Sequence, residues 1–381
     1  MIDAERVRSV LFDLVSIESV NPSLVPGGGG EERMARYVSA FLTSAGLKVR
    51  LERVAAGRFN VTGLLEGQRS GPRLMLNGHL DTVGASGMEQ PFSPRVENGR
   101  LYGRGALDMK GGIAAALLAA ESLGKERGFA GEVQIATVAD EEMESCGTRE
   151  LLKHCSADMA IVLEPTGLEV ATAHKGFAWA EIETHGRAAH GSRPDEGRDA
   201  IAFMGRVLNQ LEALQFELDQ RLAHPLLGRG SVHASLISGG QELSSYAESC
   251  KLSIERRLLP AEDATTLEAE LVAILVQLTA RDPHFRGEYK IGYSASALET
   301  SRQSPIAQRL LECARKPVGP NARFGTQPFW TDAALLQEAG IPSVLFGPGG
   351  GGMHAAVEYV NLEDVRVCAE VLIDFIRGLG R

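Results

Sequence analysis

Residues 74–85 read LMLNGHLDTVGA and combine a strand pattern with polar residues at its end. It begins as a short apolar run, which is typical of a strand buried on both faces, and the strand pattern ends at Gly78. His79 and Asp81 follow at once, before turn-forming and small residues. Because ligands of open α/β sheets bind at the carboxyl ends of the strands, a histidine and a carboxylate at this place indicate a functional site.

The composition predicts a globular protein that acts on a small molecule. The chain has 381 residues, 44 % of them hydrophobic, and this length predicts two domains. The formal net charge of -10 is spread along the sequence, which argues against nucleic-acid or anionic-membrane partners. The five cysteines contain no CxxC pair, and the first residues lack the basic and apolar regions of a signal peptide. We therefore expect a cytoplasmic protein.

Two kinds of sequence pattern alternate along the chain. In residues 1–176, short apolar runs alternate with helical patterns, as in a mainly parallel sheet covered by helices. Residues 177–295 instead contain half-exposed strand patterns, such as FAWAEIETH at 177–185, and two amphipathic helical patterns. The first pattern returns at 296–381. These patterns predict an α/β domain built from 1–176 and 296–381, with an inserted α+β domain at 177–295.

Four predicted strands of the first domain each lead into side chains that can bind a metal. Any one of these residues alone is more often a structural histidine or a solvated charge. Their joint occurrence directly after buried strands predicts that they converge on one site. The residues are His79 after LMLNG, Glu141 and Glu142 after VQIATVAD, Glu164 after MAIVL, His354 after SVLFGPGGGGM, and Asp108 in the glycine-rich segment GRGALDMKGG.

These residue types suit a metal-dependent hydrolase. Carboxylate and imidazole without thiolate are the ligands of zinc, manganese or cobalt in hydrolytic sites, and five of them can hold two ions about 3.5–4 Å apart. Of the adjacent Glu141 and Glu142, one could bind metal while the other takes a proton from water. Asp81 is placed to accept the second ring N–H of His79. We expect two divalent ions, with zinc favoured and cobalt or manganese as alternatives.

At this point the chain resembles the M20 metallopeptidases, the family that contains acetylornithine deacetylase, succinyl-diaminopimelate desuccinylase, aminoacylase and glutamate carboxypeptidase. The resemblance covers nearly the whole chain. It implies an α/β, phosphorylase/hydrolase-like catalytic domain with a mainly parallel sheet, and a ferredoxin-like α+β insertion that acts as a lid and dimerisation domain. The segments that carry it are GHLDTV, GRGALDMKGG, ADEE, VLEPT, GRAAHGSRP, ERRLLP, TDAALLQEAGIPSVLFGPG and MHAAVEYV.

The resemblance implies a role for each residue of the metal site. Asp108 would bridge both ions and precede a cis peptide bond. Glu142 and His354 would complete the shell of one ion, and Glu164 that of the other. The implied metal ligands are His79, Asp108, Glu142, Glu164 and His354, and the implied catalytic residues are Glu141 as general base and acid, Asp81 as the partner of His79, and His190.

Further residues are implied to bind substrate. His190, in AAHGSRP, would reach the active site of the partner subunit and stabilise the oxyanion. Arg257, in ERRLLP, would bind the free carboxylate of the substrate, for which a guanidinium fork is the natural partner. Gly347 and Gly349 could add backbone N–H donors, or form a simple turn. Ser244 stands where many relatives have a substrate-binding asparagine, and this departure leaves the substrate open.

The leading hypothesis is a dinuclear metal hydrolase that removes the acyl group from an amino acid with a free carboxylate. A dipeptidase or carboxypeptidase with the same site is the alternative. A non-catalytic binding protein of the same fold is a third reading, but such a protein is expected to have lost a ligand or the base, and here all five ligands and Glu141 are present. The expected partner chain is a second copy, bound through the inserted domain.

Overall fold

In the computed structural model, which describes residues 2–126 and 128–380, the stretch from Leu74 to His79 forms the buried end of strand β3 (Arg69–His79). This strand pairs in parallel with β6 (Ala130–Val138) and with β7 (Met159–Val162). A strand with a neighbour on each side and helices over both faces has no exposed surface, which explains its continuous apolar sequence. The three strands end at the same edge of the sheet.

The strand β3 lies inside a mixed sheet with the order β1-β2-β6-β3-β7-β15-β8-β13, and β14 also pairs with β8. The central pairs β3–β6, β3–β7 and β7–β15 are parallel, whereas β1–β2, β2–β6, β8–β15 and β8–β13 are antiparallel. The predicted α/β class is confirmed, but the sheet is mixed rather than mainly parallel as predicted, because parallel pairing is confined to the centre. The remaining strands are β1 (Lys48–Ala55), β2 (Arg58–Glu66), β8 (Val170–His174), β13 (Leu298–Glu299), β14 (Phe324–Gln327) and β15 (Ser343–Leu345).

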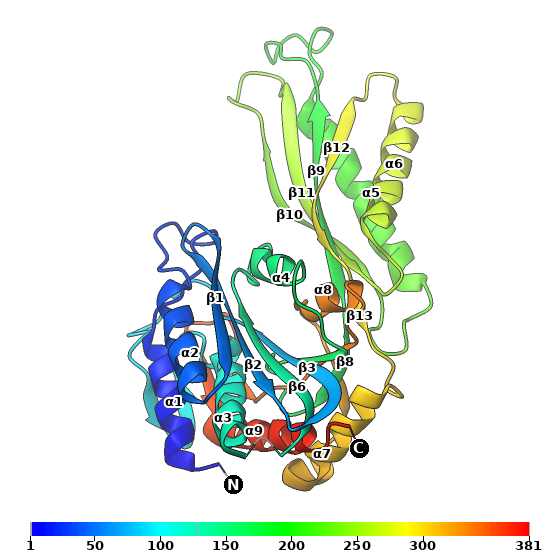
Figure 1. Cartoon of the computed structure of the whole chain (residues 1–381). Helices are drawn as coiled ribbons and strands as arrows, with labels where there is room; N and C mark the ends of the chain where they lie inside the picture. Colours follow the sequence, from blue (N-terminus) through cyan, green and yellow to red (C-terminus); the bar gives the residue numbers. More distant parts are fainter. Residues whose placement is uncertain (1, 127, 381) are drawn as a thin grey trace. The chain divides into compact units, whose positions relative to one another are not determined.

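Helices cover both faces of this sheet (Figure 1). On one face α3 packs against α9, and its alanine-rich buried surface allows the close approach. On the other face α4 contacts α8. The helices are α1 (Ala4–Ser16), α2 (Glu32–Ser44), α3 (Gly111–Glu126), α4 (Cys146–Leu151), α7 (Pro305–Val318), α8 (Ala333–Glu338) and α9 (Leu362–Arg377), with single turns at Ala106–Lys110 and Gly319–Asn321.

A small antiparallel sheet with the order β16-β17-β5-β4 lies beside the irregular turn Ala106–Lys110. It joins segments from distant parts of the sequence, because Tyr359 pairs with Tyr102 and Asn361 with Arg100. Its strands are β4 (Arg95–Glu97), β5 (Arg100–Tyr102), β16 (Gly350–Gly351) and β17 (Tyr359–Asn361).

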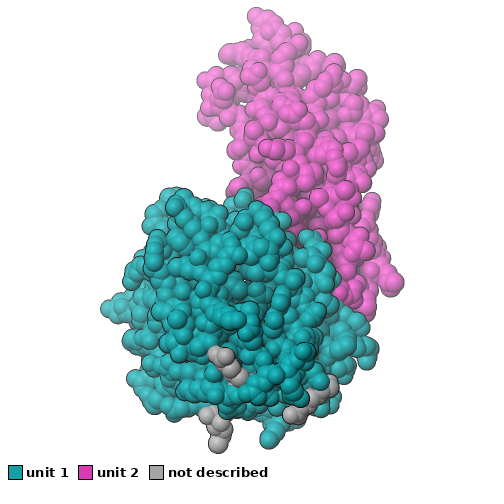
Figure 2. All heavy atoms as spheres, viewed as in Figure 1, with its two compact units in different colours: residues 1–172, 300–327, 331–381 teal, residues 173–299, 328–330 magenta. Residues whose placement is uncertain are grey.

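The chain divides into two units, shown in different colours in Figure 2. Unit 1 contains Met1–Thr172, Thr300–Gln327 and Thr331–Arg381, and unit 2 contains Ala173–Glu299 and Pro328–Trp330. Unit 2 therefore reaches a few residues beyond the predicted insertion at both ends and includes a short segment from far along the chain.

Unit 2 is an antiparallel sheet with helices on one face. The strand order is β10-β11-β9-β12, and the apolar residues that alternate along β9 pack against α5 and α6. Asp199 caps α5 and Asp263 forms a capping box at the start of α6, so both helices begin where the sequence places an aspartate. The elements are β9 (Gly176–His185), α5 (Ala200–Gln220), β10 (Ser231–Gly239), β11 (Ser249–Leu258), α6 (Ala264–Arg281) and β12 (Gly287–Ala295).

Within residues 2–126 and 128–380, every helix is too short or too polar to cross a lipid bilayer.

Candidate metal centre and active site

Asp108 lies between two histidine side chains. Its Oδ1 is 3.1 Å from Nε2 of His79, and its Oδ2 is 3.1 Å from Nε2 of His354. His79 ends β3, Asp108 belongs to the irregular turn Ala106–Lys110, and His354 follows β16. The Asp108–Met109 peptide bond is cis. A carboxylate with one histidine at each oxygen has the arrangement expected of a ligand shared by two ions.

Three glutamates complete this cluster. Oε2 of Glu142 is 3.4 Å from Nε2 of His354, and Nε2 of His79 is 3.9 Å from Oε1 of Glu164 and 4.0 Å from Oε2 of Glu141. The structure thus brings the five sequence-predicted ligands and Glu141 together. Two sets offer ligand atoms within 4.8 Å of one another, namely His79 with Asp108 and Glu142, and His79 with Glu141 and Glu164.

The carboxyl groups of the cluster provide the negative charge that a site for divalent cations needs. Burial raises the pKa of Glu141 and of Glu164 well above the usual range for a carboxyl group. For Asp108 burial acts in the same direction, but the hydrogen bonds with His354 and His79 outweigh it and hold the pKa below its usual range. Oε1 of Glu142 is buried without a hydrogen-bond partner. Several buried carboxylates need cationic partners, and metal ions are partners of that kind.

Asp81 has a wider role in the site than the sequence suggested. Nδ1 of His79 is 2.9 Å from the backbone oxygen of Asp81 and 3.6 Å from its Oδ1, so the carbonyl is the nearer acceptor. The Asp81 carboxylate also accepts the backbone N–H of Glu141 at 3.2 Å and that of Glu142 at 3.3 Å. This one residue therefore contacts His79 and fixes the main chain of both glutamates.

Sequence reasoning missed two residues here: Asn21 supports Asp81 directly, and Arg58 supports it through Asn21. Nδ2 of Asn21 donates to Asp81 at 2.7 Å and to Asp140 at 3.1 Å, while its Oδ1 accepts from Arg58 and from the backbone N–H of Ser23, both at 2.9 Å. The Asn21 amide thus uses both donor hydrogens and both acceptor lone pairs. The only sequence signal was a polar residue before a proline, which by itself predicts a turn.

Glu358 is a third residue that sequence reasoning missed. It is buried and forms an ion pair with Arg104 at 2.6 Å. Its carboxylate accepts the backbone N–H groups of Gly105, Leu107 and Asp108 at 3.0, 2.9 and 3.1 Å. The turn that carries Asp108 is therefore held by one side chain from the MHAAVEYV segment.

Three predicted substrate residues belong to unit 2. His190 and Ser244 are exposed and lie in adjacent loops, because the backbone N–H of Gly191 donates to the backbone oxygen of Ser244 at 2.7 Å. Arg257 lies on β11, where its guanidinium donates to the backbone oxygen of Pro328 at 3.0 Å. Their substrate roles remain predictions.

The predicted glycine donors already have partners within unit 1. The backbone N–H of Gly347 donates to Oγ1 of Thr166 at 3.1 Å, and that of Gly349 donates to Oδ2 of Asp364 at 3.0 Å. A substrate carboxylate would have to displace these acceptors. The arrangement favours the reading of this loop as a structural turn.

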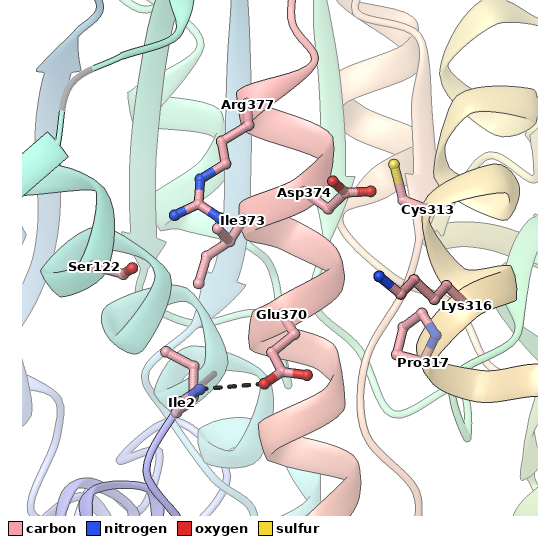
Figure 3. A pocket seen from close by; sticks show the side chains of 9 residues that line it. All are labelled: Ile2, Ser122, Cys313, Lys316, Pro317, Glu370, Ile373, Asp374 and Arg377. Atoms are coloured by element: carbon pink, nitrogen blue, oxygen red, sulfur yellow. Dashed lines mark hydrogen bonds between the residues drawn. The ribbon is translucent and has the colours of Figure 1, made fainter.

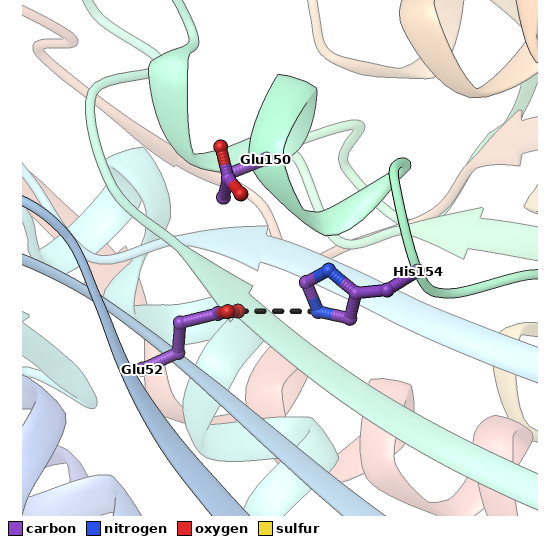
Figure 4. Close-up of side chains that lie close together, drawn as sticks. All are labelled: Glu52, Glu150 and His154. Atoms are coloured by element: carbon purple, nitrogen blue, oxygen red, sulfur yellow. Dashed lines mark ion pairs between the residues drawn. The ribbon is translucent and has the colours of Figure 1, made fainter.

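A second cluster with metal-binding side chains is better explained as an ion-pair network. Glu52, Glu150 and His154 lie close together, and His154 pairs with Glu52 at 3.1 Å (Figure 4). Arg50 also pairs with Glu52 at 2.5 Å, and Lys153 with Glu150 at 2.6 Å. Both carboxylates are thus already neutralised by basic side chains.

One hollow of unit 1 lies away from the metal-binding cluster (Figure 3). It has a volume of about 570 Å³ and is bordered by α3, α7 and α9. Ser122 on its wall is eleven residues along α3 from Gly111, which corresponds to about 17 Å. The lining residues are Ile2, Ser122, Cys313, Lys316, Pro317, Glu370, Ile373, Asp374 and Arg377, so it shares no residue with the site described above.

Comparison with known proteins identifies a family and a similar enzyme. The model of peptidase family M20/M25/M40 matches residues 75–378. The chain is 30 % identical to acetylornithine deacetylase of Myxococcus xanthus, over 96 % of this chain and 95 % of the relative.

Solved structures share the fold. A tripeptidase from Staphylococcus aureus aligns with a TM-score of 0.83 at 21 % identity, covering 99 % of this chain and 98 % of the other. A dinuclear metal binding peptidase of the M20 family from Bacillus subtilis aligns with a TM-score of 0.73 at 15 % identity, covering 98 % and 97 %.

Proposed function

The chain belongs to peptidase family M20/M25/M40 and is a metal-dependent amide hydrolase, and from this premise we propose that it removes the acyl group from an N-acyl amino acid. The observation that carries the proposal is the cluster in which the buried Asp108 lies between His79 and the more exposed His354, with Glu141 beside His79. The likeness to an acetylornithine deacetylase along almost the whole chain supports a deacylase.

Five residues are proposed to hold two divalent ions, zinc being favoured and cobalt or manganese serving as alternatives. Asp108 is the shared ligand, and the others are His79, Glu142, Glu164 and His354. When bound, such ions polarise the scissile carbonyl and lower the pKa of water. Without metal ions the cluster is negatively charged, which favours cation binding. Protonated ligands must also release their protons when they bind metal, so the affinity of the site for metal should rise with pH.

Glu141 is proposed to move the proton of the reaction. Its carboxylate takes a proton from a water molecule as the water oxygen attacks the carbonyl carbon. As the C–N bond breaks, the same carboxyl gives that proton to the leaving amine nitrogen. Burial raises the pKa of Glu141, which suits a group that must hold a proton between these steps. The backbone bond to Asp81 keeps this residue in place.

The substrate roles and the assembly are also proposals. Arg257 is proposed to bind the substrate carboxylate, and His190 to stabilise the oxyanion from the partner subunit of a homodimer formed through the inserted domain, which also acts as a lid. Ser244 lies in the loop beside His190 and is proposed to contact substrate. The five free cysteines support a reducing compartment, and we place the enzyme in the cytoplasm.

The test compares Glu141→Gln with Glu144→Gln, an exposed glutamate of the same loop. Both proteins are loaded with zinc, cobalt or manganese, their metal content is measured, and they are given N-acetyl amino acids, N-succinyl amino acids and dipeptides. Glu141→Gln should keep its metal and lower kcat by about 100-fold or more, whereas Glu144→Gln should resemble the parent. Near-parent turnover by Glu141→Gln would exclude the assigned role. A parent enzyme that cleaves only dipeptides would favour the peptidase alternative.

A further inference from the structure

Both tryptophans of the chain belong to one aromatic cluster in unit 2. The ring of Phe177 lies 5.1 Å from Trp179, 5.7 Å from Tyr293 and 6.0 Å from Trp330, measured between ring centroids. Trp179 and Tyr293 are 6.0 Å apart. We call these four residues the aromatic cluster. Its members come from β9, β12 and the short segment Pro328–Trp330.

The aromatic cluster lies on the face of the unit 2 sheet that α5 and α6 do not cover. Along β9, Ala178 and Ala180 point into the core of unit 2, so Phe177 and Trp179 point to the opposite face. Trp179 remains 36 % exposed. Trp179 and Tyr293 also line a hollow of about 560 Å³ that extends to Leu236, which is 72 % exposed, and its rim carries the charged side chains of Glu181, Glu255 and Lys290. Small-molecule sites have volumes of this order.

Arg257 lies against this cluster. Its guanidinium carbon is 5.7 Å from the centroid of the Phe177 ring, and the guanidinium donates to the backbone oxygen of Pro328. Glu255 is the acid nearest to it, with 3.6 Å between Oε1 and the guanidinium nitrogen. Oε2 of Glu255 accepts the indole N–H of Trp179 at 2.9 Å. Both oxygens of Glu255 therefore have partners, and this acid is not a free site for a cationic group.

The chemistry of an N-acyl amino acid then decides which part of it meets the aromatic cluster. Its carboxylate and its side chain are attached to the same carbon, whereas the acyl group extends from the amide nitrogen. If Arg257 holds the carboxylate, as the proposed function requires, the amino-acid side chain lies beside the guanidinium. The neighbours of the guanidinium there are the Phe177 ring and Glu255, whose oxygens already have partners, and Trp179 and Tyr293 lie beside Phe177. Aromatic rings favour an aromatic or large apolar group over a small or charged one.

The geometry points to the aromatic cluster as the subsite for the amino-acid side chain, and thus to N-acyl derivatives of aromatic or large apolar amino acids as the substrate class. This inference rests on the proposed function. It predicts that N-acetyl-phenylalanine has a kcat/KM at least about tenfold above that of N-acetyl-alanine, because burying a phenyl group removes far more apolar surface from water than burying a methyl group does. N-acetyl-ornithine should be a poor substrate.

The position of both tryptophans gives a binding readout that is independent of turnover. Metal-loaded Glu141→Gln is titrated with N-acetyl-phenylalanine, N-acetyl-leucine, N-acetyl-alanine and N-acetyl-ornithine while intrinsic tryptophan fluorescence is recorded. The first two ligands should change the emission with a Kd at least about tenfold lower than that of N-acetyl-alanine. Equal Kd values, or no emission change with N-acetyl-phenylalanine, would overturn the inference.

Variants then locate the selectivity in the aromatic cluster. Trp179→Ala should lower the phenylalanine-to-alanine ratio of kcat/KM to within about threefold of unity, and Trp179→Phe should restore most of it. Phe216→Ala, which removes a 67 % exposed aromatic ring on α5, is the matched control and should keep the ratio. A ratio that survives Trp179→Ala would show that selectivity arises elsewhere.

The failures of the two proposals are distinguishable. If the metal-loaded parent cleaves no N-acyl amino acid, the proposed function fails, and the fluorescence titration still reports whether the aromatic cluster binds an apolar carboxylate. If the parent cleaves N-acetyl-alanine as well as N-acetyl-phenylalanine, the proposed function stands and the substrate class is wrong. The tryptophan emission of the ligand-free protein is also recorded at decreasing protein concentration. A shift on dilution would mean that a second chain covers the aromatic cluster, and this would overturn its assignment as a substrate subsite.

Discussion

Glu358 and Asp108 are joined through the main chain, because Oε1 of Glu358 accepts the backbone N–H of Asp108 at 3.1 Å. The two residues are 250 positions apart, and the same carboxylate also binds the backbone of Gly105 and Leu107. The position of Asp108 between His79 and His354 therefore depends on a side chain that, among the described residues, forms no hydrogen bond or ion pair with either histidine.

Glu358→Gln should weaken metal binding. An amide keeps only one acceptor oxygen and directs N–H groups at backbone donors, so the turn around Asp108 loses part of its support. We expect a loss of about 10–100-fold in metal affinity, measured by competition with a chelator. Glu363→Gln is the control, because Glu363 is exposed at the start of α9 and pairs only with Arg366 among described residues. An affinity within twofold of the parent would contradict the assigned support.

Asn21→Asp should make stability depend on pH. The new carboxylate would face Asp81 and Asp140, which now accept the two amide hydrogens, so its pKa in the folded state should be raised. A raised pKa gives stability at low pH that is lost as the pH rises. Unfolding by urea at pH 5 and pH 8 should show an extra loss of about 1–3 kcal/mol at pH 8. Asn21→Ala lacks the charge, and its deficit should be the same at both values. Identical pH profiles for the two variants would argue against close contact with the acids.

Glu31 predicts a second pH dependence, away from the metal ligands. Burial, with a contribution from the charge of Asp81, raises the pKa of Glu31 to about 8, well above the usual 4.5 of a glutamate side chain. The folded state thus binds this proton more tightly than the unfolded state. The resulting stability is fully present below about pH 4.5 and is lost as the pH rises through about 8.

Glu31→Gln tests this linkage, because glutamine stays neutral at every pH. The free energy of unfolding of Glu31→Gln minus that of the parent should increase from pH 5 to pH 8 and then level off. Glu32→Gln, at a half-exposed neighbour paired with Arg36, should show a constant offset. If the difference for Glu31→Gln is equally constant, Glu31 is charged throughout this range.

The thiols of the folded protein should react slowly. Burial raises the pKa of Cys146 and of Cys313 to about 12, and the thiolate is the nucleophilic form. Iodoacetamide at pH 7.5 should leave both residues largely unlabelled for the time in which the urea-unfolded protein is fully labelled, as counted by mass spectrometry. Rapid labelling of Cys146 in the folded protein would contradict the raised pKa of this half-buried thiol beside Asp140.

The sequence predicted those parts of the fold whose signals are local. β3 is buried on both faces, so its apolar run and the polar residues after it were visible in one stretch. In unit 2, the alternation along β9 and the aspartates before α5 and α6 were equally direct. The metal-binding side chains could be found because parallel strands bring their carboxyl ends to one edge, whatever their separation in sequence.

The supporting contacts could not be predicted in this way. Asn21 and Glu358 act through hydrogen bonds to residues far along the chain, and such bonds leave no periodic pattern. The N–H of Gly349 is occupied by Asp364, which lies on the helix after β17, so its availability depends on tertiary packing. The segment Pro328–Trp330 joins unit 2 through the contacts of Arg257 and Trp330, although its neighbours in sequence belong to unit 1.

The insertion of Ala173–Glu299 between segments of unit 1 also sets an order of assembly during translation. Chains emerge from the ribosome with the N-terminus first. The proposed ligands up to Glu164 precede the insertion, whereas His354 and the supporting Glu358 follow it. When unit 2 has been synthesised, the growing polypeptide still lacks β15 and α9, and the face of α3 that α9 covers is bare. Most of the proposed metal ligands are therefore synthesised before some of the residues that hold them in place. The complete site can form only after the C-terminal segment Thr331–Arg381 has been synthesised.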